Sequence, residues 1–324
     1  MQTLRIAIID DHQQVAMDLV DWATLPEGTF VRAFDVPFSS EDVMVAQLAD
    51  FDVVVAMRER THFGSSAIGR LPRLKMLATT GLRNAAIDLQ ACLGRGIVVT
   101  GARGAAQSLS STAELAWSLI LGLCKQIPSG QDAARSGHWQ PTLAQGLHGK
   151  VLGLAGLGHV GSRMALLGQA FGMEVLAWSP NLKPERARAH GVEAVSRHEL
   201  FQRSDVLSMH LGLGPATAGL VDDDLLRLMK PGAYFINTAR AGLVQEQALM
   251  EALRERRIAG AGLDVFWQEP VPAGHALLQM DNVLITPHLG YVTRENLQVF
   301  YQGVLDNIRA WIDGRPVLAL NPSS

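Results

Sequence analysis

Residues 151–161, VLGLAGLGHVG, constrain the fold of this chain more than any other segment. The first five residues form a short apolar run typical of a buried strand, and Gly156, Gly158 and Gly161 follow in the spacing G-x-G-x-x-G. A helical pattern covers residues 162–171. In this context the first glycine permits a tight turn, the second lets a pyrophosphate approach the backbone, and the third lets the helix pack on the strand. The segment therefore predicts a dinucleotide-binding βαβ unit with the phosphates at the helix N-terminus.

Short apolar runs alternate with helical patterns along the rest of the chain. Such alternation predicts βαβ units and parallel sheets. A long helical pattern over residues 295–313 follows the last strand of the second set, so we expect the chain to return there to its first domain. The sequence thus predicts an α/β protein with two doubly wound parallel sheets. A domain of residues 102–289 is inserted into one made of 1–101 and 290–324, and ligands are expected in a cleft at the carboxyl ends of the strands.

The expected elements can be given by residue range. The strands of the first domain cover 5–10, 30–36, 52–57, 74–79 and 97–100, and its helices 41–49, 66–71 and 88–93. The strands of the second cover 151–155, 174–178, 206–211, 234–237, 260–265 and 283–286, and its helices 199–203, 222–229 and 245–256, beside that after the glycines. Residues 128–149 are expected to be a loose connection.

One further helix is expected over residues 110–124, SSTAELAWSLILGLC. Ser111 or Thr112 is expected to cap it, with Glu114 early in its first turn. Because this helix is apolar nearly all round, it must be buried on several sides. We expect that burial between domains, between subunits, or both.

Composition limits the possible partners. The chain of 324 residues has a formal net charge of −3 and no Lys/Arg cluster of nucleic-acid-binding type, which argues against DNA or RNA. Its two cysteines, Cys92 and Cys124, lie in apolar segments, which favours buried free thiols over a disulfide or a metal site. Asp10 and Asp11 interrupt the first apolar run too early for a signal peptide, and no apolar run of about 18 residues could span a membrane. We expect a soluble, cytoplasmic protein without metal.

Three polar residues, Arg240, Glu269 and His288, each follow an expected strand of the second domain, where an open α/β sheet places its ligand site. Taken singly, such loop residues are mostly solvent-exposed charges. With a dinucleotide they form a reactive set. Arginine can hold a carboxylate bidentately, and histidine, with an ordinary pKa of about 6.5, can protonate a developing alkoxide. Glutamate beside that histidine would favour the imidazolium and orient the ring, so the set predicts hydride transfer to a 2-keto acid, with the histidine as base in reverse.

Five ordered blocks carry a resemblance to a known family: LAGLGHVG, SMHLGLGPATAGLV (208–221), MKPGAYFINTARAGLVQEQAL (229–249), GAGLDVFWQEPVP (260–272) and ITPHLG (285–290). On these blocks nearly the whole chain resembles the D-isomer-specific 2-hydroxyacid dehydrogenases, a family that includes glyoxylate/hydroxypyruvate reductases and phosphoglycerate dehydrogenase. The resemblance implies a Rossmann nucleotide domain inserted into a flavodoxin-like substrate domain. It implies that Arg240, Glu269 and His288 are catalytic, and usually a homodimer, formed here through residues 112–124.

The resemblance also implies ligand contacts. Thr80, Gly81 and Leu82 resemble the family's substrate loop, whose backbone N–H groups would meet the substrate carboxylate together with Arg240; the alternative is an ordinary glycine turn. For His210 and Thr217 the alternative is a hydrogen-bonded loop. The positions expected to contact the cofactor are Gly156, Gly158, His159, Val160, Gly161, His210, Thr217, Thr238, Ala239, Asp264 and His288.

The end of the second strand of the nucleotide domain departs from the pattern for NAD. An acid usually holds the ribose hydroxyls about 20 residues after the glycines. Here the chain reads Trp178-Ser179-Pro180-Asn181, and Lys183 follows. The missing carboxylate removes the repulsion against a 2′-phosphate, which Ser179, Asn181 or Lys183 could bind, so the sequence favours NADP over NAD. The alternative is that the basic residues form a solvated helix face.

The sequence therefore predicts an NAD(P)-dependent reductase of a small 2-keto acid, working on the D-2-hydroxy acid in reverse. A dehydrogenase of another small anion, such as formate or phosphite, is one alternative, against which Glu269 argues. A non-catalytic dinucleotide-sensing binding protein is another, because the family resembles corepressors that keep the fold.

Overall fold

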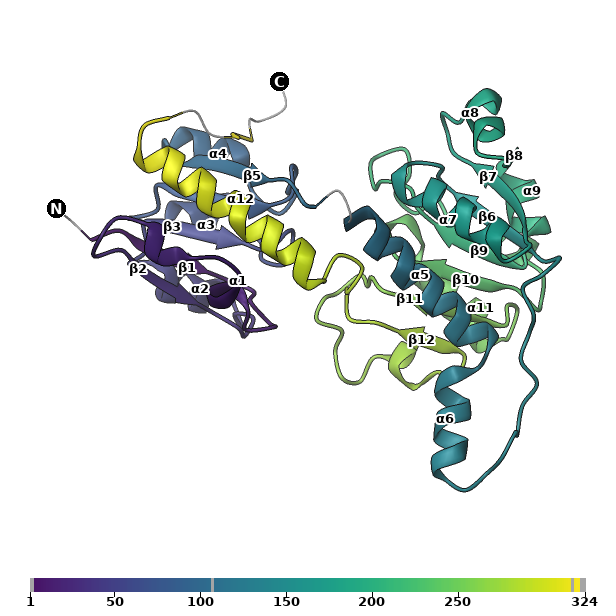
Figure 1. Ribbon diagram of the computed structural model, residues 1–324. Coiled ribbons are helices and arrows are strands. Elements are labelled where there is room, and N and C mark those ends of the chain that lie inside the picture. Colours follow the sequence, from purple (N-terminus) through teal and green to yellow (C-terminus); the bar gives the residue numbers. More distant parts are fainter. Residues whose placement is uncertain (1–2, 106–107, 316–317, 321–324) are drawn as a thin grey trace. The chain divides into compact units, whose positions relative to one another are not determined.

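The computed structural model describes residues 3–105, 108–315 and 318–320. The chain divides into two compact units. Unit 1 consists of Met1–Ala106 and Thr293–Ser324, and unit 2 of Gln107–Val292. Each unit is built on its own parallel sheet (Figure 1), so the expectation of two doubly wound α/β sheets is confirmed.

Unit 1 has a five-stranded sheet in the order β2-β1-β3-β4-β5. Its core is formed by continuous apolar strands such as VVVA of β3, which is buried on both faces. Helices α2, α3 and α4 cover one face through residues such as Leu48 and Ile68. The long helix α12 lies against β4, β5 and α1, so the last helix of the chain belongs to the first sheet. The elements are β1 (Arg5–Ile8), α1 (Ala16–Leu19), β2 (Phe30–Ala33), α2 (Glu41–Leu48), β3 (Val53–Ala56), α3 (Ser65–Gly69), β4 (Met76–Thr80), α4 (Leu89–Gly94), β5 (Val98–Ala102) and α12 (Arg294–Ile312).

Unit 2 has a seven-stranded sheet in the order β12-β11-β10-β9-β6-β7-β8. Helices α5, α7 and α8 cover one face and α9, α10 and α11 the other, each face with its own apolar core. The elements are α5 (Ser108–Cys124), α6 (Ile127–Arg135), β6 (Val151–Ala155), α7 (His159–Ala170), β7 (Glu174–Trp178), α8 (Pro184–Ala189), β8 (Glu193–Ala194), α9 (Arg197–Arg203), β9 (Val206–Met209), α10 (Asp223–Leu228), β10 (Tyr234–Asn237), α11 (Glu246–Arg254), β11 (Gly260–Leu263) and β12 (Val283–Ile285).

The strand order of unit 2 determines where a ligand fits. From β6 the chain winds outward to β7 and β8, and then crosses back to β9 on the other side of β6. The connections after β6 and after β9 therefore diverge at the carboxyl edge of the sheet. A crevice at such a switch point is the usual ligand site of open α/β sheets.

Two details correct the expectations from sequence. Helix α5 begins at Ser108, so Ser111 and Thr112 lie inside it and neither caps it. Residues 128–149 are not all loose, because α6 forms at their start, with Pro128 in its first turn where no amide hydrogen is needed. None of the residues of α6 is buried, and the helix extends away from the sheet of unit 2 (Figure 1).

Candidate active site

The three glycines after β6 meet three different spatial requirements. Gly156 has φ +109°, and a Cβ there would lie 2.6 Å from the carbonyl oxygen of His210. A Cβ on Gly161 would lie 2.1 Å from the carbonyl oxygen of Gly156, so helix α7 can approach the turn only with glycine there. A Cβ on Gly158 would meet nothing within 4 Å. The backbone at Gly158 therefore borders open space at the N-terminus of α7, which fits a bound pyrophosphate.

His210 closes the other side of this turn, directly after β9. Its Nε2 lies 2.9 Å from the hydroxyl of Ser208. Burial lowers the pKa of His210 to about 4, so its imidazole is neutral at physiological pH. Further along the same loop, the Thr217 hydroxyl donates to the carbonyl of Gly212 (2.7 Å) and accepts from the amide of Gly214 (2.9 Å). The Thr217 hydroxyl thus has hydrogen-bond partners within its own loop.

The turn after β10 presents Arg240. The side chain of Asn237, which is 2% exposed, donates to the carbonyl of Arg240 (3.0 Å) and accepts from the amide of Ala239 (3.0 Å). Nη1 of Arg240 lies 2.7 Å from the carbonyl oxygen of Ala239. Asn237 therefore shapes the turn that carries the arginine. Sequence reading missed it, although its place at the end of a strand, three residues before Arg240, was a usable signal.

Thr238 lies in the same turn and is buried. Among the described residues its hydroxyl has no hydrogen-bond partner. A buried hydroxyl without a partner costs free energy unless a ligand satisfies it. A hydroxyl of this kind at the carboxyl edge of the sheet is suited to a hydrogen bond with a polar group of a ligand.

Glu269 and His288 form a close pair. Nδ1 of His288 lies 2.6 Å from Oε2 of Glu269, and the other carboxylate oxygen accepts the amide of Phe266 (2.9 Å). The side chains of His288 and Glu269 are 28% and 33% exposed, respectively, so a ligand can reach them. Burial raises the pKa of Glu269, but the hydrogen bond and charge of His288, the Phe266 amide and the charge of Arg240 outweigh it and hold that pKa below its ordinary value. Arg240 is therefore close enough to act on this pair.

Asp264, which follows β11, accepts hydrogen bonds from the loop that carries His288. The Asp264 side chain accepts the Thr286 hydroxyl and the Leu289 amide (both 2.7 Å) on one oxygen, and the Gly290 amide (2.9 Å) on the other. Asp264 is 1% exposed. Burial raises its pKa, although these three hydrogen bonds oppose the rise. The structure thus gives Asp264 a place beneath the histidine loop, in addition to the cofactor contact expected from the sequence.

The end of β7 lies beside the glycine turn, because the Gly156 amide donates to the carbonyl of Trp178 (2.8 Å). Ser179 is half-buried, whereas Asn181 and Lys183 are exposed. No acid stands at this strand end. Sequence reading missed a cation here: the guanidinium of Arg197, at the start of α9, lies 5.9 Å from the centre of the Trp178 ring. Of the remaining expected contacts, His159 and Val160 begin α7 beside the open space at Gly158.

The expected substrate loop lies in unit 1, at the end of β4. Thr80 is fully buried, and its hydroxyl accepts the amide of Arg58 (3.0 Å). The Gly81 amide donates to the carbonyl of Ala102 (2.7 Å) and is therefore not available to a ligand, so the Leu82 amide remains the candidate donor in this loop. Gly81 has φ +98°, and a Cβ there would lie 2.4 Å from Nη1 of Arg58. The glycine therefore lets a guanidinium lie directly against this loop.

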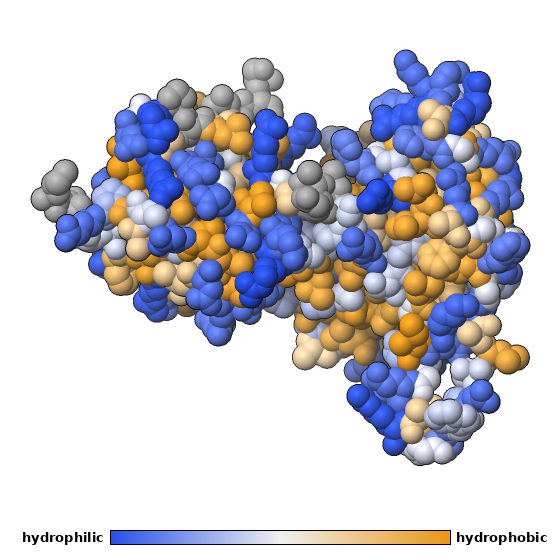
Figure 2. All heavy atoms as spheres, in the orientation of Figure 1, coloured by the Kyte–Doolittle hydropathy of each residue, from blue (hydrophilic) through white to orange (hydrophobic). Residues whose placement is uncertain are grey.

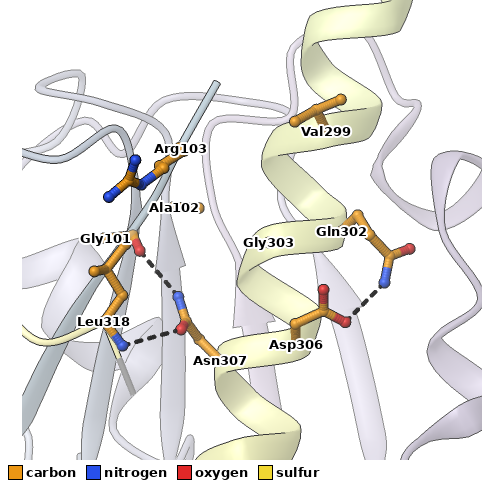
Figure 3. A pocket seen from close by; sticks show the side chains of 9 residues that line it. All are labelled: Gly101, Ala102, Arg103, Val299, Gln302, Gly303, Asp306, Asn307 and Leu318. Atoms are coloured by element: carbon orange, nitrogen blue, oxygen red, sulfur yellow. Dashed lines mark hydrogen bonds between the residues drawn. The ribbon is translucent and has the colours of Figure 1, made fainter. Parts of the chain in front are cut away.

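A cavity of about 360 Å³ opens elsewhere in unit 1, between β5, α12 and Leu318 (Figure 3). The Asn307 side chain donates to the carbonyl of Gly101 (3.0 Å) and accepts the amide of Leu318 (3.3 Å), while Gln302 donates to Asp306 (2.9 Å). These polar groups bond to one another, and none of the expected site residues lines the cavity. It is separate from the candidate active site.

The described part of the chain offers neither a metal site nor a membrane-spanning helix. No group of three or more His, Cys, Asp and Glu side chains there is arranged to hold a metal ion. No helix in residues 3–105, 108–315 and 318–320 has the length and apolarity needed to traverse a bilayer.

The chain is similar in sequence and in structure to known proteins. Residues 117–290 match the family model described as D-isomer specific 2-hydroxyacid dehydrogenase, NAD binding domain. The chain is 36% identical over 281 residues to a glyoxylate reductase of Thermococcus litoralis, covering 84% of each protein. The structure of a phosphoglycerate oxidoreductase from Vibrio cholerae is similar with a TM-score of 0.91 and 35% identity, covering 96% of this chain and 100% of that one.

The curated D-3-phosphoglycerate dehydrogenases that match are longer. That of Mycobacterium tuberculosis is 34% identical over 294 residues, which cover 90% of this chain and 54% of the relative. The chain therefore spans about half the length of these relatives.

Proposed function

Because this chain belongs to the D-isomer-specific 2-hydroxyacid dehydrogenase family, we propose that it is an NAD(P)-dependent enzyme that transfers a hydride between a nicotinamide cofactor and a small 2-keto acid or D-2-hydroxy acid. The observation that carries the proposal is the contact of 2.6 Å between His288 and Glu269, within the electrostatic reach of Arg240. An imidazole held by a carboxylate, beside a guanidinium, is the set of groups that reduction of an anionic ketone requires. A protein that only senses a dinucleotide has no need of it.

The proposed mechanism assigns one task to each residue. Arg240 binds the substrate carboxylate through two parallel N–H groups and fixes the keto carbon in position. The reduced nicotinamide, when bound, supplies the hydride. His288 donates a proton from Nε2 to the carbonyl oxygen as negative charge develops there, while Nδ1 stays on Glu269. Glu269 stabilises the imidazolium before that transfer, and in the oxidative direction His288 accepts the hydroxyl proton instead.

We propose that residues 102–289 hold the cofactor. Gly156, Gly158 and Gly161, with His159 and Val160, would receive the pyrophosphate, and Thr238 the nicotinamide end. The other proposed contacts are His210, Thr217, Ala239 and Asp264. The residues 1–101 and 290–324 would form the substrate-binding domain, in which Leu82 contributes its amide.

We propose a preference for NADP over NAD. It is supported by the missing acid at the end of β7 and by the cations near that strand end, Lys183 and Arg197. Ser179 and Asn181 could add hydrogen bonds to a 2′-phosphate. A carboxylate at this strand end would instead repel it.

The proposed substrate carries a second anionic group besides its carboxylate. Support comes from the Arg58 guanidinium against Gly81 and from relatives named D-3-phosphoglycerate dehydrogenase. Glyoxylate, which has no such group, is the competing candidate, because a relative that aligns over 84% of its own length is named glyoxylate reductase.

We further propose a homodimer in a reducing compartment such as the cytoplasm. Helix α6 and the chain after it leave large apolar side chains in solvent: Ile127 is 56%, Trp139 83% and Leu143 92% exposed. Figure 2 shows hydrophobic and hydrophilic residues mixed on the part of unit 2 around α6 that extends away from the sheet. A second copy would cover such residues. Light scattering should find a dimer in the unmodified protein and a monomer after Trp139→Ser with Leu143→Ser. The two cysteines are buried and free, in keeping with a reducing compartment.

The decisive experiment is a spectrophotometric screen at pH 7. Glyoxylate, hydroxypyruvate, pyruvate and 3-phosphohydroxypyruvate are offered with NADH and with NADPH, and formate and phosphite with NAD and NADP. We expect 2-keto acid reduction, faster with NADPH and with the phosphorylated acid. Turnover of formate or phosphite alone would assign the chain to the other branch. Cofactor binding without any turnover would support the sensing protein instead.

A further inference from the structure

The backbone of His288 adopts a conformation that histidine rarely takes. Its φ is +55°, in the left-handed region. This conformation costs free energy in a residue other than glycine, and contacts with the surrounding structure can offset that cost. Other parts of unit 2 do hold the peptide groups that follow His288.

Two groups hold the peptide of Gly290, two residues on. Asp264 accepts the amides of Leu289 and Gly290 from one side. On the other side the hydroxyls of Ser111 and Thr112 both donate to the carbonyl oxygen of Gly290, at 3.0 and 2.9 Å. The peptide chain after His288 is thus held at both its N–H and C=O groups.

The two hydroxyls come from α5, 179 and 178 residues away in the sequence. A serine or threonine inside a helix commonly turns its hydroxyl back to the carbonyl four residues earlier. Ser118 of the same helix does so, since its hydroxyl donates to the carbonyl of Glu114 (2.8 Å). Ser111 and Thr112 direct hydroxyls to another segment, the loop that carries His288.

Helix α5 is a firm support for this contact. Its residues Ala113, Ala116 and Ile120 are fully buried in the core of unit 2. The hydroxyls therefore transmit the position of a packed helix to the histidine loop. Since most of the helix is anchored by apolar burial, we expect the fold to tolerate their loss.

We propose that Ser111 and Thr112 are positioning residues for His288: by holding the carbonyl of Gly290 they direct the imidazole so that Nδ1 meets Glu269 and Nε2 is free to exchange a proton. This proposal rests on the proposed function, because it assigns a task to the acid–base pair. Neither hydroxyl needs to touch the substrate or the cofactor.

The test compares three variants of the full chain. S111A with T112V removes both hydroxyls at nearly constant shape. S111T with T112S keeps both hydroxyls and is the matched control, and S118A removes a hydroxyl from the same helix that bonds only within it. T112V alone serves if the first variant does not fold, as judged by its thermal unfolding.

Two readouts are used. With a 2-keto acid, S111A/T112V should lower kcat on the order of 10- to 100-fold while the dissociation constant of the cofactor is unchanged. In the protein without cofactor, the ¹³C carboxyl signal of Glu269 should titrate at a higher pH than in the parent, because its hydrogen bond with His288 is loosened. S111T/T112S and S118A should match the parent in both.

Parental kcat and an unchanged Glu269 titration in S111A/T112V would overturn the proposal. So would an equal loss of kcat in S118A, since that would show a general effect of altering the helix. If the parent reduces no 2-keto acid, the proposed function fails, yet the carboxyl titration, which needs neither substrate nor cofactor, still decides whether the hydroxyls position His288.

Discussion

Nδ1 of His288 lies 2.6 Å from Oε2 of Glu269. The second oxygen of this carboxylate is bound by the amide of Phe266, so Glu269 cannot turn without losing a hydrogen bond. The ring of His288 therefore has one nitrogen committed to the protein, and only Nε2 is left for a substrate.

Replacing His288 or Glu269 should lower the rate of reduction to different extents. His288→Gln should lower kcat by about 10²- to 10⁴-fold, the usual contribution of a general acid. Glu269→Gln keeps the size of the side chain but removes the charge that favours the imidazolium. The loss of kcat should therefore be smaller than in His288→Gln, and it should grow with pH. Rates of 2-keto acid reduction measured from pH 5 to 9 check both, and equal rates in parent and variants would refute the assigned roles.

The lowered pKa of Glu269 also affects stability. A carboxylate whose pKa is lower in the folded than in the unfolded state stabilises the fold fully above its unfolded pKa, about 4.3, and loses this effect as the pH falls through the folded value. Urea unfolding of parent and Glu269→Gln should therefore differ most above pH 5 and converge towards pH 3. A difference that grew on acidification would contradict this sign.

Arg240→Lys tests the two-pronged grip on the substrate. Lysine keeps the positive charge but has no planar fork, so KM for the keto acid should rise by about tenfold or more, and Arg240→Ala should lower kcat as well. The dissociation constant of the cofactor, measured by fluorescence in the absence of substrate, should stay as in the parent. Unchanged KM in the lysine variant would exclude bidentate binding.

Two glycine substitutions distinguish a glycine that borders a bound ligand from one that is required for packing of the protein backbone. Gly158→Ala meets no protein atom within 4 Å, so it should leave thermal stability unchanged and weaken cofactor binding about tenfold. Gly161→Ala would place a methyl 2.1 Å from a backbone oxygen and should destabilise unit 2 by about 2 kcal/mol or more. Calorimetry with and without cofactor checks the pair, and parental cofactor affinity in Gly158→Ala would place the pyrophosphate elsewhere.

Lys183→Ala and Arg197→Ala should each weaken the binding of NADPH more than that of NADH, by roughly 3- to 10-fold. Only NADPH carries a 2′-phosphate that these cations could bind. Lys150→Ala is the matched control: Lys150 is exposed and precedes β6, at the opposite edge of the sheet. The measurement is the ratio of the two dissociation constants. Equal weakening of both cofactors would remove the case for NADP.

The amino edge of the sheet in unit 1 depends on Asp52. Its carboxylate binds Arg73 (3.0 Å), Lys75 (3.1 Å) and the amide of Arg5 (3.1 Å). Burial raises the pKa of Asp52, but these partners outweigh it and the pKa is lowered. The carboxylate thus stabilises the fold above its unfolded pKa of about 3.9 and ceases to do so as the pH falls through the folded value. Asp52→Asn should cost about 2 kcal/mol in urea unfolding at pH 7 and little at pH 3.

The sequence by itself determined the two parallel sheets and the glycine turn. Strands such as β3 and helices such as α7 follow from the order of their apolar residues. That pattern lies wholly within each segment, so it can be recognised without knowing the rest of the fold. The elements that it missed are α1, α6, α8 and β8. Three of these have six residues or fewer and α6 buries no residue, so none has an apolar period long enough to read.

The sequence also named Arg240, Glu269 and His288 as candidates, and their catalytic roles stay predictions. What only the tertiary structure decided is which atoms meet. Glu269 and His288 are 19 residues apart, and the hydroxyls on Gly290 come from 178 and 179 residues away. A parallel sheet brings the ends of its strands to one edge, but a hydrogen bond requires two atoms within about 3 Å, and no local pattern of residues encodes that distance.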